Sequence, residues 1–103
     1  MKDRQGFTQL HWAVYESVGL AGAADTARLL VVRGANINAR DTEGSTPLFW
    51  AVWLGNKDLV VFLLEHGADQ SLRGKEGLTP LESAEKYGSR ELAALLRSHA
   101  TAH

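Results

Sequence analysis

A segment of 33 residues recurs along this 103-residue chain and constrains its fold more than any other feature. The run GSTPL at 44–48 returns as GLTPL at 77–81 and, in weaker form, as GFTQL at 6–10. A fixed period in the range of roughly 20–50 residues predicts stacked copies of one structural unit. Stacking is required because a single unit cannot bury its own apolar face.

Local signals predict two helices in each unit. A threonine caps the first helix with its side-chain oxygen, and in two units a proline follows at the first helical position, where its missing N–H costs nothing. A glycine then ends this helix in a left-handed conformation, and the next residue caps the second helix. These signals are Thr46, Pro47, Gly55 and Asn56 in the second unit and Thr79, Pro80, Gly88 and Ser89 in the third.

The first unit departs from this pattern. Gln9 replaces the proline, and about five extra residues, assigned to 17–21, lengthen the turn between its helices. We expect one helix from about Thr8 to Glu16 and another from about Ala24 to Arg33. The insertion is interpreted either as a longer loop, tolerated because closure entropy grows slowly with length, or as a cover for the N-terminal face or a partner contact made by its apolar residues.

The chain resembles the ankyrin repeat family over almost its whole length. The residues that carry the likeness are Asp41, Gly44, 46–48, Ala51, Gly55, 63–64, 67–69, Gly77, 79–81, Ala84 and Gly88. The resemblance implies an all-α solenoid of helix-turn-helix repeats joined by β-turn fingers. We expect a single domain at 1–103, with repeats at about 3–40 and 41–73 and a C-terminal capping repeat at about 74–100. It also implies that His11 ties a finger to a helix by hydrogen bonds.

The same resemblance implies that a partner protein docks on the fingers and the exposed side of the first helices. The positions that correspond to this surface are Arg4, Gln5, Phe7, Tyr15, Glu16, Thr42, Glu43, Ser45, Trp53, Leu54, Lys75, Glu76, Leu78, Lys86 and Tyr87. Phe7 and Leu78 are apolar at turn positions that are normally solvated. We therefore predict a non-catalytic protein–protein interaction module whose partner is another protein.

Aromatic residues recur on the first helices. Tyr15, Trp53 and Tyr87 occupy equivalent or adjacent positions and would form a ridge if they faced the same side, since aromatic anchors dominate interface energetics. Trp12 and Trp50 are predicted to pack between repeats. The alternative is that all these rings serve packing. The strongest single candidate for a hot spot is Trp53 with Leu54, between the fingers of Glu43 and Glu76.

The two ends of the array differ in polarity. The third unit carries Glu82, Ser83, Glu85 and Lys86 where the second has Phe49, Trp50, Val52 and Trp53, as a terminal repeat requires. The first unit keeps an apolar face. The alternative function is therefore a structural subunit that self-associates, or stacks in a larger assembly, through this N-terminal face.

Charge and composition narrow the function classes. The net charge of −1 predicts no affinity for nucleic acid or for a membrane surface, and no apolar run is long enough to span a membrane. An excess of acids at 41–73 is interpreted either as a solvated surface or as a stripe that favours a basic partner. We find no catalytic motif and expect no enzyme activity, metal site or cofactor. The absence of cysteine fits an intracellular, most simply cytoplasmic, protein.

Overall fold

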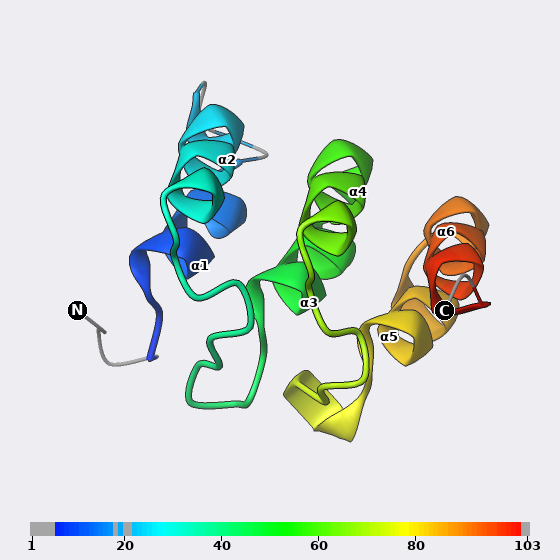
Figure 1. Ribbon diagram of the computed structural model, residues 1–103. Helices are drawn as coiled ribbons and strands as arrows, with labels where there is room; N and C mark the ends of the chain where they lie inside the picture. Colours follow the sequence, from blue (N-terminus) through cyan, green and yellow to red (C-terminus); the bar gives the residue numbers. More distant parts are fainter. Residues whose placement is uncertain (1–5, 18, 20–21, 102–103) are drawn as a thin grey trace.

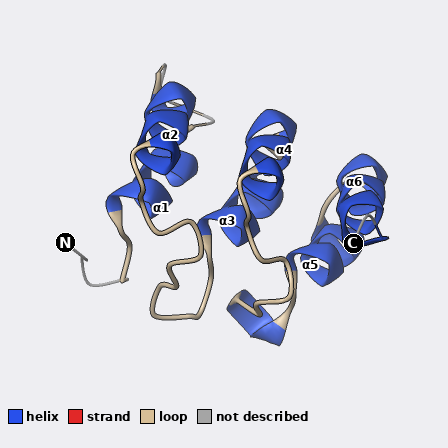
Figure 2. Cartoon of the chain, viewed as in Figure 1, coloured by secondary structure: helices blue, strands red, loops and turns tan. Residues whose placement is uncertain are grey.

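Six α-helices form three antiparallel pairs that stand side by side (Figures 1 and 2). The computed structural model describes residues 6–17, 19 and 22–101, and no strand occurs among them. The helices are α1 (Gln9–Glu16), α2 (Ala23–Val32), α3 (Pro47–Leu54), α4 (Lys57–Glu65), α5 (Pro80–Tyr87) and α6 (Arg90–Thr101). This architecture confirms the all-α repeat fold predicted from the sequence.

The predicted helix starts are confirmed. The hydroxyl oxygens of Thr46 and Thr79 accept the backbone N–H groups of the residues three positions later, at 3.2 Å in both cases. Asn56 caps α4 in the same way, because its Oδ1 accepts the N–H of Leu59 at 3.2 Å. Each of these side chains satisfies a backbone donor that the first turn of a helix leaves unpaired.

The predicted helix ends at Gly55 and Gly88 are both confirmed, but the predicted left-handed conformation is confirmed only at Gly55 and is wrong at Gly88. Gly55 has a φ of 76° and ends α3 in the left-handed region. Gly88 has a φ of −106° and a ψ of −149°, so it is not left-handed. A Cβ at Gly88 would lie 3.1 Å from the Cα of Ala84, so the close approach of the backbone to α5 is what favours glycine there.

The three pairs stack in register. The first helices α1, α3 and α5 form one layer with extensive mutual contacts, and α2, α4 and α6 form a second layer with fewer contacts between neighbours. The loops at 33–46 and 66–79 project beyond the layer of first helices, where the family's fingers were expected (Figure 1). The core lies between the layers, and its largest fully buried side chains include Phe49, Leu48 and Leu59.

Polar contacts join successive units outside the core. Arg40 donates from Nη2 to the carbonyl oxygen of Arg73 at 2.7 Å, and the N–H of Asp69 donates to Oδ1 of Asn38 at 2.8 Å. At the other end of the helices, Nδ2 of Asn56 donates to Oγ of Ser17 at 3.0 Å. The inserted segment therefore starts with a contact to the second unit. Val18 and Leu20, which were candidates to cover the N-terminal face, lie outside the described residues.

The outer face of the third unit is polar. Arg97 on α6 and Glu85 on α5 form an ion pair there. The equivalent positions in the second unit are Leu64, which is partly buried against the core, and Val52, which is buried. The capping role of the third unit stays a prediction.

Candidate functional site

The second finger is held to its own helix by one buried carboxylate. Oδ1 of Asp41 accepts the N–H groups of Glu43 and Ser45, both at 2.9 Å, and Oδ2 accepts the indole N–H of Trp50, also at 2.9 Å. Three donors therefore share one carboxylate that is almost fully buried. Because these bonds fix the turn and its distance from α3, the second finger is a preformed surface. Asp41 was counted among the acids at 41–73, for which a solvated surface was one of two interpretations, and its burial shows that the solvated interpretation is wrong for this residue.

His11 fastens the second finger to the first unit. Its Nδ1 accepts the N–H of Thr8 at 3.1 Å, and its Nε2 lies 2.9 Å from the carbonyl oxygen of Ser45. A carbonyl oxygen only accepts, so Nε2 carries the proton and the neutral ring satisfies both bonds. The fully buried side chain thus performs the structural role that was expected of it.

Two residues expected on the docking surface are buried instead. Phe7 is 3% exposed because its ring packs against His11, Trp12 and Trp50, with centroids 5.0 to 5.6 Å apart. Ser45 is fully buried, and its Oγ accepts the N–H of Lys75 at 3.1 Å. The expectation that both side chains lie at the exposed finger surface is therefore wrong. Leu78 is half-buried, and Arg4 and Gln5 lie outside the described residues.

A hollow of about 410 Å³ lies between the second finger and the first helices, and we call it the finger hollow. Its aromatic wall consists of Phe7, Trp12, Tyr15 and Trp50. Its polar lining consists of Asp41, Thr42, Glu43 and Lys75. Several predicted site residues from three fingers and one helix therefore meet at one place.

The third finger is attached to a second aromatic group. Trp53 stacks on Phe49 at 6.2 Å between centroids and meets Tyr87 edge to face at 5.2 Å. Nζ of Lys75 lies 5.3 Å from the centroid of the Trp53 ring, within the range of a cation–π contact. The exposed Trp53 and Tyr87 side chains therefore form a continuous surface with the finger at 75–77.

The predicted ridge is divided into two aromatic groups. Tyr15 contacts Phe7, Trp12 and Trp50 rather than Trp53. Trp12, which was predicted to pack in the core, is 39% exposed, whereas Trp50 is 9% exposed, as predicted. Leu54 is half-buried and lies at the α3–α4 turn, in a hollow lined by Gly55 and Lys57, so it does not share the finger surface with Glu43. A role for these rings in partner binding stays a prediction.

Glu76 on the third finger is held by the end of α5. The hydroxyl of Tyr87 donates to both carboxylate oxygens of Glu76, at 2.8 and 3.0 Å, and Lys86 donates to one of them at 3.3 Å. The Tyr87 hydrogen bond, with a smaller contribution from Lys86, holds the pKa of Glu76 below its usual value. Hydrogen bonds to the charged form of a carboxylate favour that form.

The contact between Tyr87 and Glu76 predicts how the stability of the fold depends on pH. Because the folded-state pKa is lowered, the stabilisation that Glu76 provides is fully present above the usual pKa of a glutamate and is lost as the pH falls through the lower folded value. Replacing Tyr87 with phenylalanine removes the main donor and is expected to move the pKa of Glu76 up toward the usual value. A carboxyl NMR titration measures this shift, with Tyr15→Phe as the matched control. An unchanged pKa in Tyr87→Phe would contradict the assignment of this hydrogen bond.

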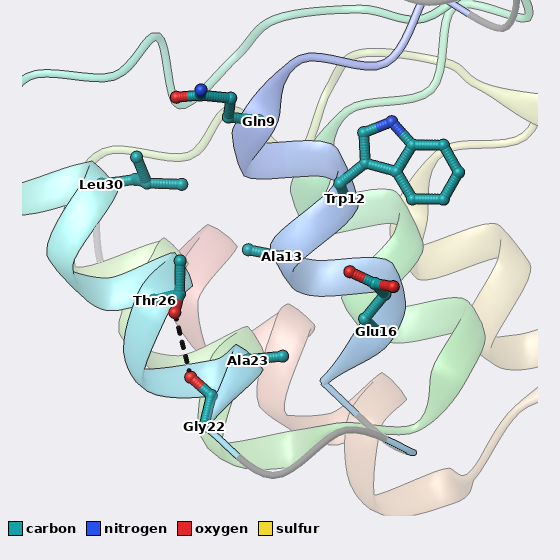
Figure 3. Close-up of a pocket in the computed structure, with 8 residues that line it drawn as sticks. All are labelled: Gln9, Trp12, Ala13, Glu16, Gly22, Ala23, Thr26 and Leu30. Atoms are coloured by element: carbon teal, nitrogen blue, oxygen red, sulfur yellow. Dashed lines mark hydrogen bonds between the residues drawn. The ribbon is translucent and has the colours of Figure 1, made fainter.

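The outer side of the first unit carries a groove of about 530 Å³. Its lining residues come from both helices and the turn between them: Gln9, Trp12, Ala13, Glu16, Gly22, Ala23, Thr26 and Leu30 (Figure 3). Glu16, predicted on the finger side, lines this groove. Thr26 donates from Oγ1 to the carbonyl oxygen of Gly22 at 3.1 Å, so its polar atom is engaged at the start of α2.

The groove residues correspond, position for position, to the residues through which later units stack. Counted from the capping threonine, Trp12 corresponds to Trp50, and counted from the end of the second helix, Leu30 corresponds to Leu63. Trp50 and Leu63 are buried where the first unit lies beside them. Trp12 and Leu30 retain exposed surface because no described residue takes that place.

Comparison with known proteins agrees with this architecture. A family model for ankyrin repeats in three copies matches residues 10–103, so the chain belongs to the ankyrin repeat family. Ankyrin repeats are generally protein–protein interaction modules and are typically non-catalytic. Among the described residues, no group of three or more His, Cys, Asp or Glu side chains is placed to hold a metal ion. No helix in the described part of the chain is long and apolar enough to cross a membrane.

The relatives share only part of their length with this chain. The chain is 42% identical to Inversin-B of Xenopus laevis over 57 residues, which is 55% of this chain and 5% of that protein. It is 45% identical over 47 residues to an ankyrin repeat-containing protein of Schizosaccharomyces pombe, covering 46% of this chain and 20% of that protein. A match to the palmitoyltransferase AKR1 of Saccharomyces cerevisiae is 38% identical over 63 residues and covers 61% of this chain and 8% of that enzyme.

Proposed function

We propose that this chain is a non-catalytic module that binds another protein through its second and third fingers and the exposed side of its first helices. The observation that carries the proposal is the placement of exposed aromatic residues beside these fingers. Tyr15, Trp53 and Tyr87 are all exposed, although rings of this size are costly to leave in water. Exposed aromatic clusters on a rigid surface are typical of binding sites.

The rigidity of the fingers supports this proposal. Asp41 and His11 hold the second finger, and Glu76 holds the third through Tyr87. A surface that is ordered before binding loses less conformational entropy when a partner docks. The near-neutral net charge of −1 gives no reason to expect nucleic acid or an anionic membrane as the partner.

The proposal is tested by removing the exposed ring of Trp53, which lies beside the third finger. A partner would be isolated from native lysate, purified and titrated against the chain. Trp53→Ala is expected to weaken the affinity by about ten-fold or more, as expected for an aromatic anchor. Leu29→Ala is the matched control, because Leu29 is a large exposed apolar side chain on α2, away from the fingers. The proposal fails if Trp53→Ala and Tyr87→Ala both bind the partner as tightly as the original chain.

A second candidate function is supported by the groove on the first unit. Its residues occupy the positions that stack in the later units, so another ankyrin-type unit is the shape that would fit it. In this alternative the chain is a structural subunit that self-associates or joins a larger assembly through its N-terminal face. Light scattering across a concentration series separates the alternatives, since a strict monomer at all concentrations contradicts self-association.

We also propose the repeat boundaries 3–40, 41–73 and 74–100 within a single domain at 1–103. The first two repeats each contain one complete helix pair, and the third contains α5 and all of α6 except its last residue, Thr101. For the compartment, the cysteine-free sequence supports an intracellular, cytoplasmic location.

A further inference from the structure

The finger hollow presents two aromatic side chains at a fixed angle. Tyr15 is 45% exposed and meets Trp12 at an interplanar angle of 78°. Phe7 and Trp50 are buried behind them. Phe7 meets Trp12 edge to face and Tyr15 at a tilted angle, and Trp50 meets Tyr15 edge to face. Phe7 and Trp50 therefore hold the rings of Tyr15 and Trp12 in place, and these two exposed rings present aromatic surface to the hollow.

The polar lining of the hollow has an excess of negative charge. Two carboxylates, Asp41 and Glu43, and one ammonium group, Lys75, line it. Lys75 is directed to the ring of Trp53 in the neighbouring aromatic group. Asp41 is occupied by three N–H donors but still contributes its charge.

Glu43 differs from its counterpart in the next finger. The two residues are 33 positions apart, and the carboxylate of Glu76 is engaged by Tyr87 and Lys86. The carboxylate of Glu43 is exposed and forms no ion pair with any residue that the structure describes. Only its backbone N–H is used, in the bond to Asp41. The second finger therefore carries an acceptor that is available to a ligand.

We propose that the finger hollow receives an arginine side chain of the partner protein, an inference that rests on the proposed function. A guanidinium group stacks on aromatic rings and donates two parallel N–H bonds to a carboxylate. Tyr15 and Trp12 supply the rings, and Glu43 supplies the carboxylate. A quaternary ammonium group has no N–H to donate to Glu43 and is bound best by a cage of several exposed rings, whereas two of the four rings here are buried.

The test uses N-acetyl-arginine amide as the probe and the indole N–H resonances of the intact chain as the readout. The probe is expected to shift the Trp12 resonance with saturation, while N-acetyl-citrulline amide, which has the same shape without the charge, binds at least about five-fold more weakly. Glu43→Gln is expected to weaken the affinity for the arginine probe by about five-fold. The matched control is Glu65→Gln, an exposed glutamate on α4, which should leave the binding unchanged.

Three results would overturn this inference. They are equal binding of the arginine and citrulline probes, unchanged binding in Glu43→Gln, and tighter binding of N-acetyl-trimethyllysine amide than of the arginine probe. Glu43→Gln is expected to fold normally, because it keeps the bond from the backbone N–H of residue 43 to Asp41 that holds the finger. A loss of probe binding in this variant therefore reports on the side chain. Loss of partner affinity in Trp53→Ala, together with no arginine binding, would remove this inference and leave the proposed function standing.

Discussion

Replacing Trp50 with alanine is expected to lower the free energy of unfolding by about 3–5 kcal/mol, the range for removing a large ring from a packed core. The ring lies between the first two units, in contact with Phe7 and Tyr15. Its removal also leaves Oδ2 of the buried Asp41 without its donor. Because domains of this size are stable by only about 5–15 kcal/mol, much of the stability would be lost.

Two further variants separate packing from hydrogen bonding at this position. Trp50→Phe keeps most of the ring but removes the indole N–H, so a loss of about 1–3 kcal/mol is expected from the unpaired carboxylate oxygen. Trp53→Ala is the matched control, since Trp53 is 36% exposed and should cost clearly less than Trp50→Ala. Urea denaturation followed by circular dichroism measures the free energy of unfolding of Trp50→Ala, Trp50→Phe and Trp53→Ala. Equal losses for Trp50→Ala and Trp53→Ala would contradict the buried role of Trp50.

Replacing His11 with alanine is expected to destabilise the fold by about 2–4 kcal/mol. The variant creates a cavity and leaves the N–H of Thr8 without its acceptor. It also removes one of two donors to the carbonyl oxygen of Ser45, which keeps the N–H of Asp41. The Ser45 bond crosses from the first unit to the second, so the effect should be largest on the attachment of the first unit. Hydrogen exchange is expected to accelerate most in α1 and α2.

Controls for this prediction come from the chain itself. His11→Leu retains apolar volume and loses only the hydrogen bonds, so it isolates their contribution. His66 is exposed, and its Nδ1 lies 2.8 Å from the carbonyl oxygen of Phe62 within its own helix turn. His66→Ala is therefore expected to change the stability by less than about 0.5 kcal/mol. A stability unchanged in His11→Leu would show that the ring acts through packing alone.

Local signals predicted the helices of this chain well. Thr46, Thr79 and Asn56 act through atoms a few residues away, so their roles depend little on the rest of the fold. Repetition of the signals at 33 residues then fixed the number of helix pairs and the order of stacking. The family comparison confirms the repeat class that the sequence predicted.

The site was harder to predict because exposure depends on neighbours. Trp12 and Trp50 occupy equivalent positions, but among the described residues a preceding helix pair lies beside Trp50 and none lies beside Trp12, so Trp50 is buried and Trp12 is exposed. Ser45 looked like an exposed finger residue, but its N–H donates to Asp41 and its Oγ accepts the N–H of Lys75, so the residue is turned inward. The bond between Asp41 and Trp50 joins residues nine positions apart, and no local pattern in the sequence indicated it.

The ion pair between Glu85 and Arg97 opposes the stacking of a further repeat on the third unit. If a second copy of the chain placed its N-terminal face on the third unit, it would remove both charges from water, and that desolvation is costly. Repeated contacts of that head-to-tail kind produce open filaments when the rotation between copies does not close a ring. We therefore expect the third unit to act as a terminator of polymerisation, which keeps a protein built from self-similar layers from assembling into fibres.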